Sequence, residues 1–129
     1  MYEERLSRIG PQVTEQELRE SLDAYCASAR ELGASDALPV AAGAVPVDER
    51  VTLKCRVPKC FGYGTSAHCP PYSMKPEETR AALARYRWGV AFRLKVPPRV
   101  VVRDKSTITE RVEAYRKVFE IAGRLESLA

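Results

Sequence analysis

Three of the chain's four cysteines and its only histidine lie in one short segment, CRVPKCFGYGTSAHCPPYS, which runs from Cys55 to Ser73. The spacing is Cys-x4-Cys-x8-Cys-Pro-Pro, with the thiols at Cys55, Cys60 and Cys69. Thiolates bind zinc and the iron of iron–sulfur clusters, so this pattern favours a metal site with the three cysteines as ligands. Free thiols in a turn and a disulfide between two of the three are the alternatives. A Cys-x-x-Cys pair is absent from the segment, which argues against thioredoxin-like redox chemistry.

Prolines and glycines give this segment the bends that a ligand loop needs. Pro58 bends the chain between the first two cysteines. Gly62 and Gly64 permit positive φ angles and let backbone N–H groups approach sulfur without an intervening Cβ. Pro70 pushes Cys69 into an extended conformation, which fixes the direction of its side chain. We therefore expect the loop to turn its thiols toward a shared centre.

The cysteine pattern indicates that a metal is bound more clearly than it indicates which metal. Three thiolates with a fourth ligand fit tetrahedral zinc and also a [4Fe–4S] cluster. The spacing differs from the close cysteine pairs of zinc fingers, and a cysteine followed by proline ends a common ferredoxin motif. We therefore favour an iron–sulfur cluster, with zinc as the alternative.

The fourth ligand stays open between Cys26, His68, a protein partner and sequence outside this chain. Cys26 lies on the apolar stripe of a predicted helix, where a buried structural cysteine is the simpler interpretation. His68 directly precedes Cys69, and neighbouring side chains of an extended chain point to opposite sides. If Cys69 faces the metal, we expect His68 to face away from it.

Composition predicts a single domain, residues 1–129, with a modest core: the chain has 129 residues, of which 45% are hydrophobic. The net charge of +4 is spread among interspersed acids and bases, so we expect no specific nucleic-acid binding. The first residues, MYEERLSRIGPQ, contain no apolar stretch typical of an export signal, and no run is long enough for a membrane span. We infer a cytoplasmic protein, in which thiols are kept reduced and clustered cysteines more often bind metal.

The periodicity of apolar residues predicts a helical framework with a few strands. Thr14 and Glu17 form a capping-box pattern at the start of the first helix, and Gly33 follows its end; Thr107 and Glu110 repeat the pattern before the last helix. The predicted elements are a helix over 14–32, an irregular passage from residue 36 ending in a strand at 51–54, a helix over 76–86, a strand over 90–96 with an extension at 100–102, and a helix from 107 to the end. Two strands separated by a helix suggest a β-α-β unit, so the predicted class is α/β or α+β, with helices packed on a small mixed sheet.

The cysteine segment, with SMKPEETRAALARYRWG after it, resembles a prokaryotic family described as predicted metal-binding proteins (domain of unknown function 2284). The family pattern is Cys-x-x-Pro-x-Cys-x-x-Tyr-Gly followed by Cys-Pro-Pro, which falls here on Cys55, Pro58, Cys60, Tyr63, Gly64, Cys69, Pro70 and Pro71. The resemblance implies metal binding, without a reaction or a substrate. It also implies that this chain is the N-terminal part of a longer architecture, because family members usually continue into a second cysteine-rich stretch.

Three functional hypotheses follow. The first is an iron–sulfur protein that uses Cys55, Cys60 and Cys69 as ligands, for electron transfer or for cluster handling with a protein partner. The second is a structural zinc module that binds another protein or associates with itself. The third is a metal-dependent enzyme, which has the least support because no acid–base constellation accompanies the thiols.

Overall fold

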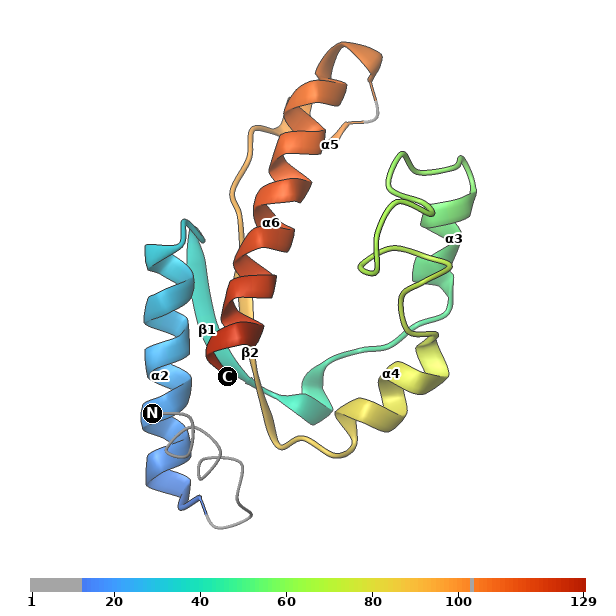
Figure 1. Ribbon diagram of the computed structural model, residues 1–129. Helices are drawn as coiled ribbons and strands as arrows, with labels where there is room; N and C mark the ends of the chain where they lie inside the picture. Colours follow the sequence, from blue (N-terminus) through green and yellow to red (C-terminus); the bar gives the residue numbers. More distant parts are fainter. Residues whose placement is uncertain (1–12, 103) are drawn as a thin grey trace. The chain divides into compact units, whose positions relative to one another are not determined.

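The computed structural model describes residues 13–102 and 104–129, which divide into two compact units. Unit 1 comprises the described residues up to Pro39 together with Val90–Ala129, and unit 2 is Val40–Gly89. The elements (Figure 1) are α2 (Glu15–Glu31), β1 (Asp36–Ala41), η2 (Ala42–Ala44), α3 (Arg50–Arg56), α4 (Pro76–Leu83), β2 (Trp88–Arg93), α5 (Pro98–Val101), η3 (Lys105–Thr107) and α6 (Ile108–Leu128). The amino-terminal segment 1–12, on which the argument against an export signal rests, lies outside the described residues.

Helix α2 begins and ends where its sequence predicts. The Glu17 N–H donates to the Thr14 hydroxyl oxygen (3.2 Å), and the Thr14 N–H donates to the Glu17 carboxylate (2.9 Å), so the capping box is complete. The hydrogen bonds that the Thr14 N–H and hydroxyl donate to the Glu17 carboxylate hold its pKa below the ordinary value. At the other end Gly33 has a φ of +112°, the left-handed conformation that favours glycine after a helix.

The sheet has two strands, β1 and β2, and they run antiparallel. The Ser35 N–H donates to the Arg93 carbonyl and the Ala42 N–H donates to the Arg87 carbonyl, both at 2.9 Å, so each end of β1 meets the opposite end of β2. The fold is therefore α+β, and the parallel β-α-β arrangement expected from the strand–helix–strand order is wrong. The strand β1 lies where an irregular passage is expected, because its pairing with β2 is a non-local interaction that the local sequence does not reveal.

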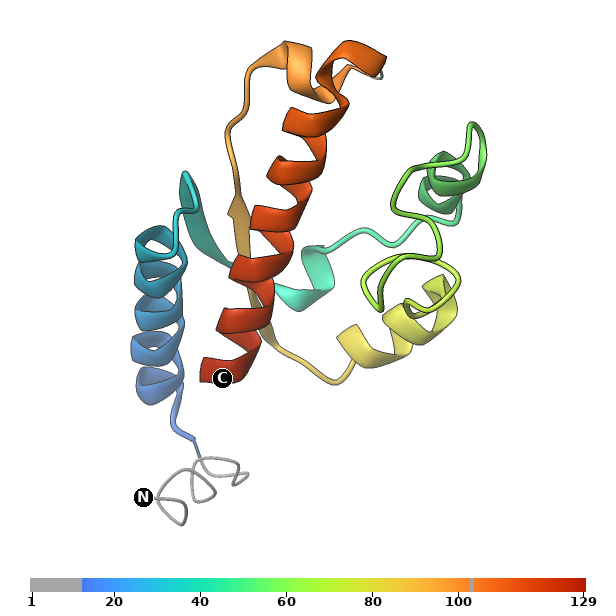
Figure 2. The same cartoon turned by 45° about the horizontal axis from the view of Figure 1, so that its top comes forward.

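The core of unit 1 lies where α2, the sheet and α6 meet, as Figures 1 and 2 show. Its buried side chains include Cys26, Ala29, Ala37 and Ile121, with the half-buried Phe92 and others packed against them. Most of these side chains are small, which lets α2 and α6 approach each other closely. The predicted apolar face of α2 is confirmed, since its buried residues are Leu22, Cys26 and Ala29.

The last helix, α6, begins after Thr107 as predicted, but without the predicted capping box. The Thr107 hydroxyl donates to the carbonyls of Val102 and Asp104 and does not cap α6, and Glu110 forms an ion pair with Arg99 (3.1 Å). The expected capping box is therefore wrong, because both side chains have other partners. The expected strand extension at 100–102 is also wrong: it largely coincides with the short helix α5, which packs against α6.

Unit 2 contains α3 where a strand over 51–54 is expected. The Arg50 N–H donates to the Asp48 carboxylate (2.8 Å), which starts a helical turn, and the Thr52 hydroxyl donates to the Glu49 carbonyl (2.6 Å). Val51 stays 61% exposed on this helix. The alternation of apolar and polar residues was thus too short to distinguish a strand from one exposed helical turn.

Helix α4 begins at Pro76, as predicted, with Lys75 as its N-cap. Arg80 of this helix forms an ion pair with Glu49 (2.6 Å) and donates to the Val47 carbonyl (3.0 Å), so it joins α4 to the segment that precedes α3. The same contact holds the pKa of Glu49 below its ordinary value. No helix among the described residues is both long and apolar enough to cross a membrane.

Candidate metal centre

The three loop cysteines occupy three different backbone environments within unit 2. Cys55 lies in the last turn of α3, Cys60 follows a tight reversal closed by a bridge between Arg56 and Lys59, and Cys69 lies in a run of turns before α4. Figure 1 shows this segment in green to yellow-green between α3 and α4. All three side chains are half-buried, and none forms a disulfide.

Backbone hydrogen bonds fold the segment back on itself. The Cys60 N–H donates to the Cys55 carbonyl (3.0 Å), so the backbones of the first two cysteines meet at the two ends of one turn. The Gly64 N–H donates to the Pro70 carbonyl (2.7 Å), which brings the chain after Cys60 against the chain after Cys69. Gly64 has a φ of +75°, so glycine is required at this bend by its conformation.

The sulfur atoms of Cys60 and Cys69 share one side of Gly62. A Cβ atom added at Gly62 would lie 3.2 Å from the Cys69 Sγ and 3.8 Å from the Cys60 Sγ. The two sulfurs are therefore separated by no more than the sum of these distances. Gly62 is itself buried, in a loop whose cysteines are only half-buried. The loop thus brings two soft donors, the kind that a thiolate metal site uses, against the same glycine.

A complete set of ligands is not gathered in the described part of the chain. No three side chains of histidine, cysteine, aspartate or glutamate lie together closely enough there to hold a metal ion. Cys55 adjoins Cys60 through the backbone, and His68 is exposed, with its backbone N–H donating to the Ser66 hydroxyl (3.3 Å). The donor chemistry fits a thiolate-bound metal, with two sulfurs placed together and the third in the adjoining turn.

Cys26 differs from the loop cysteines because it belongs to the core of unit 1. Only 3% of it is exposed, and it packs among residues such as Ala29 and Ile121. Burial raises the pKa of the Cys26 thiol, against a smaller opposing effect of Arg30. The prediction of a buried structural cysteine is confirmed, and a neutral thiol in this environment is a poor metal ligand.

Basic side chains surround the first two loop cysteines. Lys54, Arg56 and Lys59 are exposed, and the Lys59 ammonium lies 5.3 Å from the centre of the Tyr63 ring. A cation over an aromatic ring is attracted to its π face, which favours an ordered position for Lys59 beside Cys60. Positive charges at these positions would offset the negative charge of thiolate ligands.

A family model described as "predicted metal-binding protein (DUF2284)" matches residues 38–129, which include the whole cysteine segment. The chain belongs to the DUF2284 family. The match confirms the resemblance inferred from the motif and covers most of the chain beyond α2. Neither the curated proteins nor the solved structures yielded a match. Membership of DUF2284 supports metal binding at the level of the family description, without naming the metal.

The sequence indicates Gly62 as a residue with backbone freedom, but its contact with two sulfurs appears only in the structure. The sequence holds no signal for this contact. A glycine that is needed because side chains crowd it and one that is needed because of its φ angle cannot be distinguished from the sequence. The distinction appears only in the positions of the sulfur atoms around Gly62.

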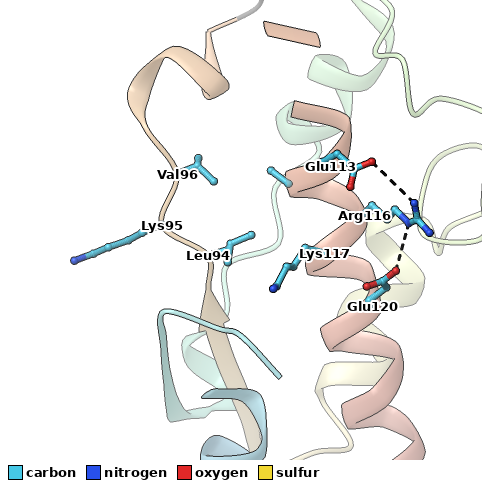
Figure 3. Close-up of a pocket in the computed structure, with 8 residues that line it drawn as sticks. Leu94, Lys95, Val96, Glu113, Arg116, Lys117 and Glu120 are labelled. Carbon is cyan, nitrogen blue, oxygen red and sulfur yellow. Dashed lines mark ion pairs between the residues drawn. The ribbon is translucent and has the colours of Figure 1, made fainter. Parts of the chain in front are cut away.

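Unit 1 of this DUF2284 protein also contains an open groove of about 370 Å³, between the chain that follows β2 and α6 (Figure 3). Arg116 on its wall pairs with Glu120 (3.3 Å) and more distantly with Glu113 (4.0 Å). Lys95 and Lys117 add two positive charges. The ion pairs neutralise much of the wall, so the groove does not present a concentrated charge to a ligand.

Proposed function

We propose that this protein holds an iron–sulfur cluster in the loop 55–73, with Cys55, Cys60 and Cys69 as ligands. The observation that carries the proposal is the meeting of the Cys60 and Cys69 sulfurs at Gly62. Family membership supports metal binding in general, and the Cys69-Pro70 step favours iron–sulfur over zinc. When bound, such a cluster accepts and donates single electrons. Electron transfer, or the handing of a cluster to another protein, is the use that this loop fits best.

The contribution of the protein's own residues is binding and charge compensation. The turn that joins Cys55 to Cys60 supplies two thiolates from its two ends. The reversal at Gly64 brings in the third thiolate, Cys69. Lys54, Arg56 and Lys59 reduce the electrostatic cost of gathering these anions. Three thiolates leave one position of a four-ligand centre, and we propose that a protein partner supplies that donor.

Purification without oxygen, followed by visible spectroscopy and by analysis of iron, acid-labile sulfide and zinc, tests this function. We expect brown protein that contains iron and sulfide. Cys55→Ser, Cys60→Ser and Cys69→Ser should each lose most of the iron, because serine replaces a soft ligand by a hard one. Cys26→Ala is the matched control and should retain it, because its sulfur lies in the core of unit 1.

The outcomes separate the hypotheses. Colourless protein with stoichiometric zinc, lost from the same three variants, would overturn the cluster in favour of a zinc module. Protein without any metal, together with loop variants of unchanged stability, would overturn metal binding at these cysteines altogether. Loss of iron from Cys26→Ala, with its fold intact, would contradict the proposed ligand set.

A further inference from the structure

Gly62 differs from the other glycines whose role the structure explains. Gly33 and Gly64 have φ angles of +112° and +75°, so their backbone conformation accounts for glycine. Gly62 has no positive φ, and any residue could adopt its backbone conformation. Its surroundings are what disfavour a side chain, because an added Cβ would crowd the Cys69 sulfur at 3.2 Å and reach ordinary contact with the Cys60 sulfur at 3.8 Å.

The size of this steric conflict matters more for a metal site than for the fold. A contact of 3.2 Å between a Cβ and the Cys69 Sγ is tighter than nearly all observed Cβ contacts, and relieving it would move the sulfur by a few tenths of an ångström. A half-buried loop thiol can shift by that amount at little cost to stability. Metal–ligand distances, in contrast, hold to within about 0.2 Å.

We infer that Gly62 is a positioning residue of the metal centre: the missing side chain lets the Cys60 and Cys69 sulfurs approach the same point of the main chain. This inference rests on the proposed function and deepens it. It predicts that any side chain at position 62 displaces the Cys69 sulfur from its place beside Gly62, even though the backbone tolerates the change. Metal affinity should therefore fall while the metal-free fold is preserved.

Titration with cobalt(II), a spectroscopic probe of thiolate sites, tests the inference on Gly62→Ala. Gly43→Ala is the matched control, because Gly43 lies in the same unit with no atom within 4 Å of an added Cβ and without a positive φ. We expect Gly62→Ala to bind cobalt(II) about tenfold more weakly or worse, with an altered sulfur-to-cobalt charge-transfer band. Gly43→Ala should match the wild type, and circular dichroism of the metal-free proteins should not distinguish the three. Equal affinity and equal spectra for Gly62→Ala and wild type would overturn the inference.

A second measurement needs no metal. Alkylation of the metal-free protein with a small maleimide, followed site by site with mass spectrometry, reports on the surroundings of each sulfur. Gly62→Ala should change the reaction rate at Cys69, because the new methyl group displaces this sulfur, and leave the rate at Cys55 unchanged. An unchanged rate at Cys69 would contradict the placement of Gly62. If the wild type takes up neither cobalt nor iron, the proposed function fails, while the alkylation rates still decide what Gly62 does.

Discussion

Cys26 and the loop cysteines differ in what surrounds their sulfur atoms, and this difference assigns them different roles. The sulfur of Cys26 is enclosed by apolar side chains that bridge α2 and α6, including Ala29 and Ile121. The sulfurs of Cys60 and Cys69 meet beside a glycine on a half-buried loop. A small apolar side chain can replace the first, whereas under the proposed function only another soft donor can replace the others.

At position 26 we expect serine to be worse than alanine. Cys26→Ser places a hydroxyl among apolar side chains that offer it no hydrogen-bond partner. The unfolding free energy should therefore fall by about 1–3 kcal/mol. Cys26→Ala removes the sulfur without adding a polar group and should cost less. Chemical denaturation of the two variants, with metal content measured in parallel, checks both statements. A serine variant as stable as the alanine variant would show that the site is not as apolar as the structure indicates.

At the scale of the elements, the end of α2 depends on Gly33. Its φ of +112° disfavours a side chain, and an added Cβ would also meet the end of the Lys117 side chain, with its Nζ at 2.8 Å. Lys117 is exposed and flexible and can move away, so the backbone conformation is the larger obstacle.

Gly33→Ala should therefore lower the unfolding free energy by about 1–2 kcal/mol, the cost of a left-handed residue with a Cβ. The control is Gly123→Ala within α6, where nothing lies within 4 Å of an added Cβ. Alanine there should raise the unfolding free energy by about 0.5–1 kcal/mol through helix propensity. Thermal and denaturant unfolding of both variants measures the difference. Stability changes of the same sign at the two positions would show that the φ angle does not determine the effect of alanine.

Local signals predicted α2 well because its partners lie within its own sequence. Thr14 and Glu17 bond to each other, but the same spacing at Thr107 and Glu110 failed because Arg99 and nearby carbonyls compete for those side chains. The strand β1 and the helical form of α3 escaped prediction for a related reason: one depends on a distant strand, the other on a single turn started by Asp48.

The cysteine spacing predicted which residues form the candidate site, and the structure added how two of them meet. The sequence does not specify the direction of a cysteine side chain. The contact of Cys60 and Cys69 with Gly62 could therefore be found only in the structure. The identity of the metal depends on the fourth donor and on the cell, and neither is encoded in the spacing of three cysteines.

Across the whole molecule, apolar burial is unevenly distributed between the two units. Of the buried hydrophobic residues in the described chain, only Ala42 belongs to unit 2. Unit 2 instead exposes large apolar side chains such as Val51, Val57 and Tyr72. Hydrophobic burial therefore stabilises unit 1 far more than unit 2. In small domains with little core, metal binding commonly supplies the missing folding energy.

Hydrogen–deuterium exchange should consequently divide the protein along this boundary. Without metal, amides of unit 2 should exchange rapidly and those of α2 and α6 slowly, because local opening follows the density of buried contacts. Reconstitution with iron and sulfide should slow exchange in unit 2 by at least about tenfold and change unit 1 little. Equal protection of unit 2 with and without metal would contradict a folding role for the metal, although metal binding itself would stand.

The strands β1 and β2 form a β-hairpin, which the hydrogen bond from the Ala42 N–H to the Arg87 carbonyl closes. The chain between these two residues, which is most of unit 2, is the loop of this hairpin. Closing a flexible loop reduces the entropy of the chain, and non-local strand pairs form slowly for that reason. Any ordering of the chain between Gly43 and Tyr86 shortens the effective loop and lowers the entropic barrier to pairing β1 with β2. A ligand of unit 2 thus affects the folding kinetics of a sheet to which it contributes no atom.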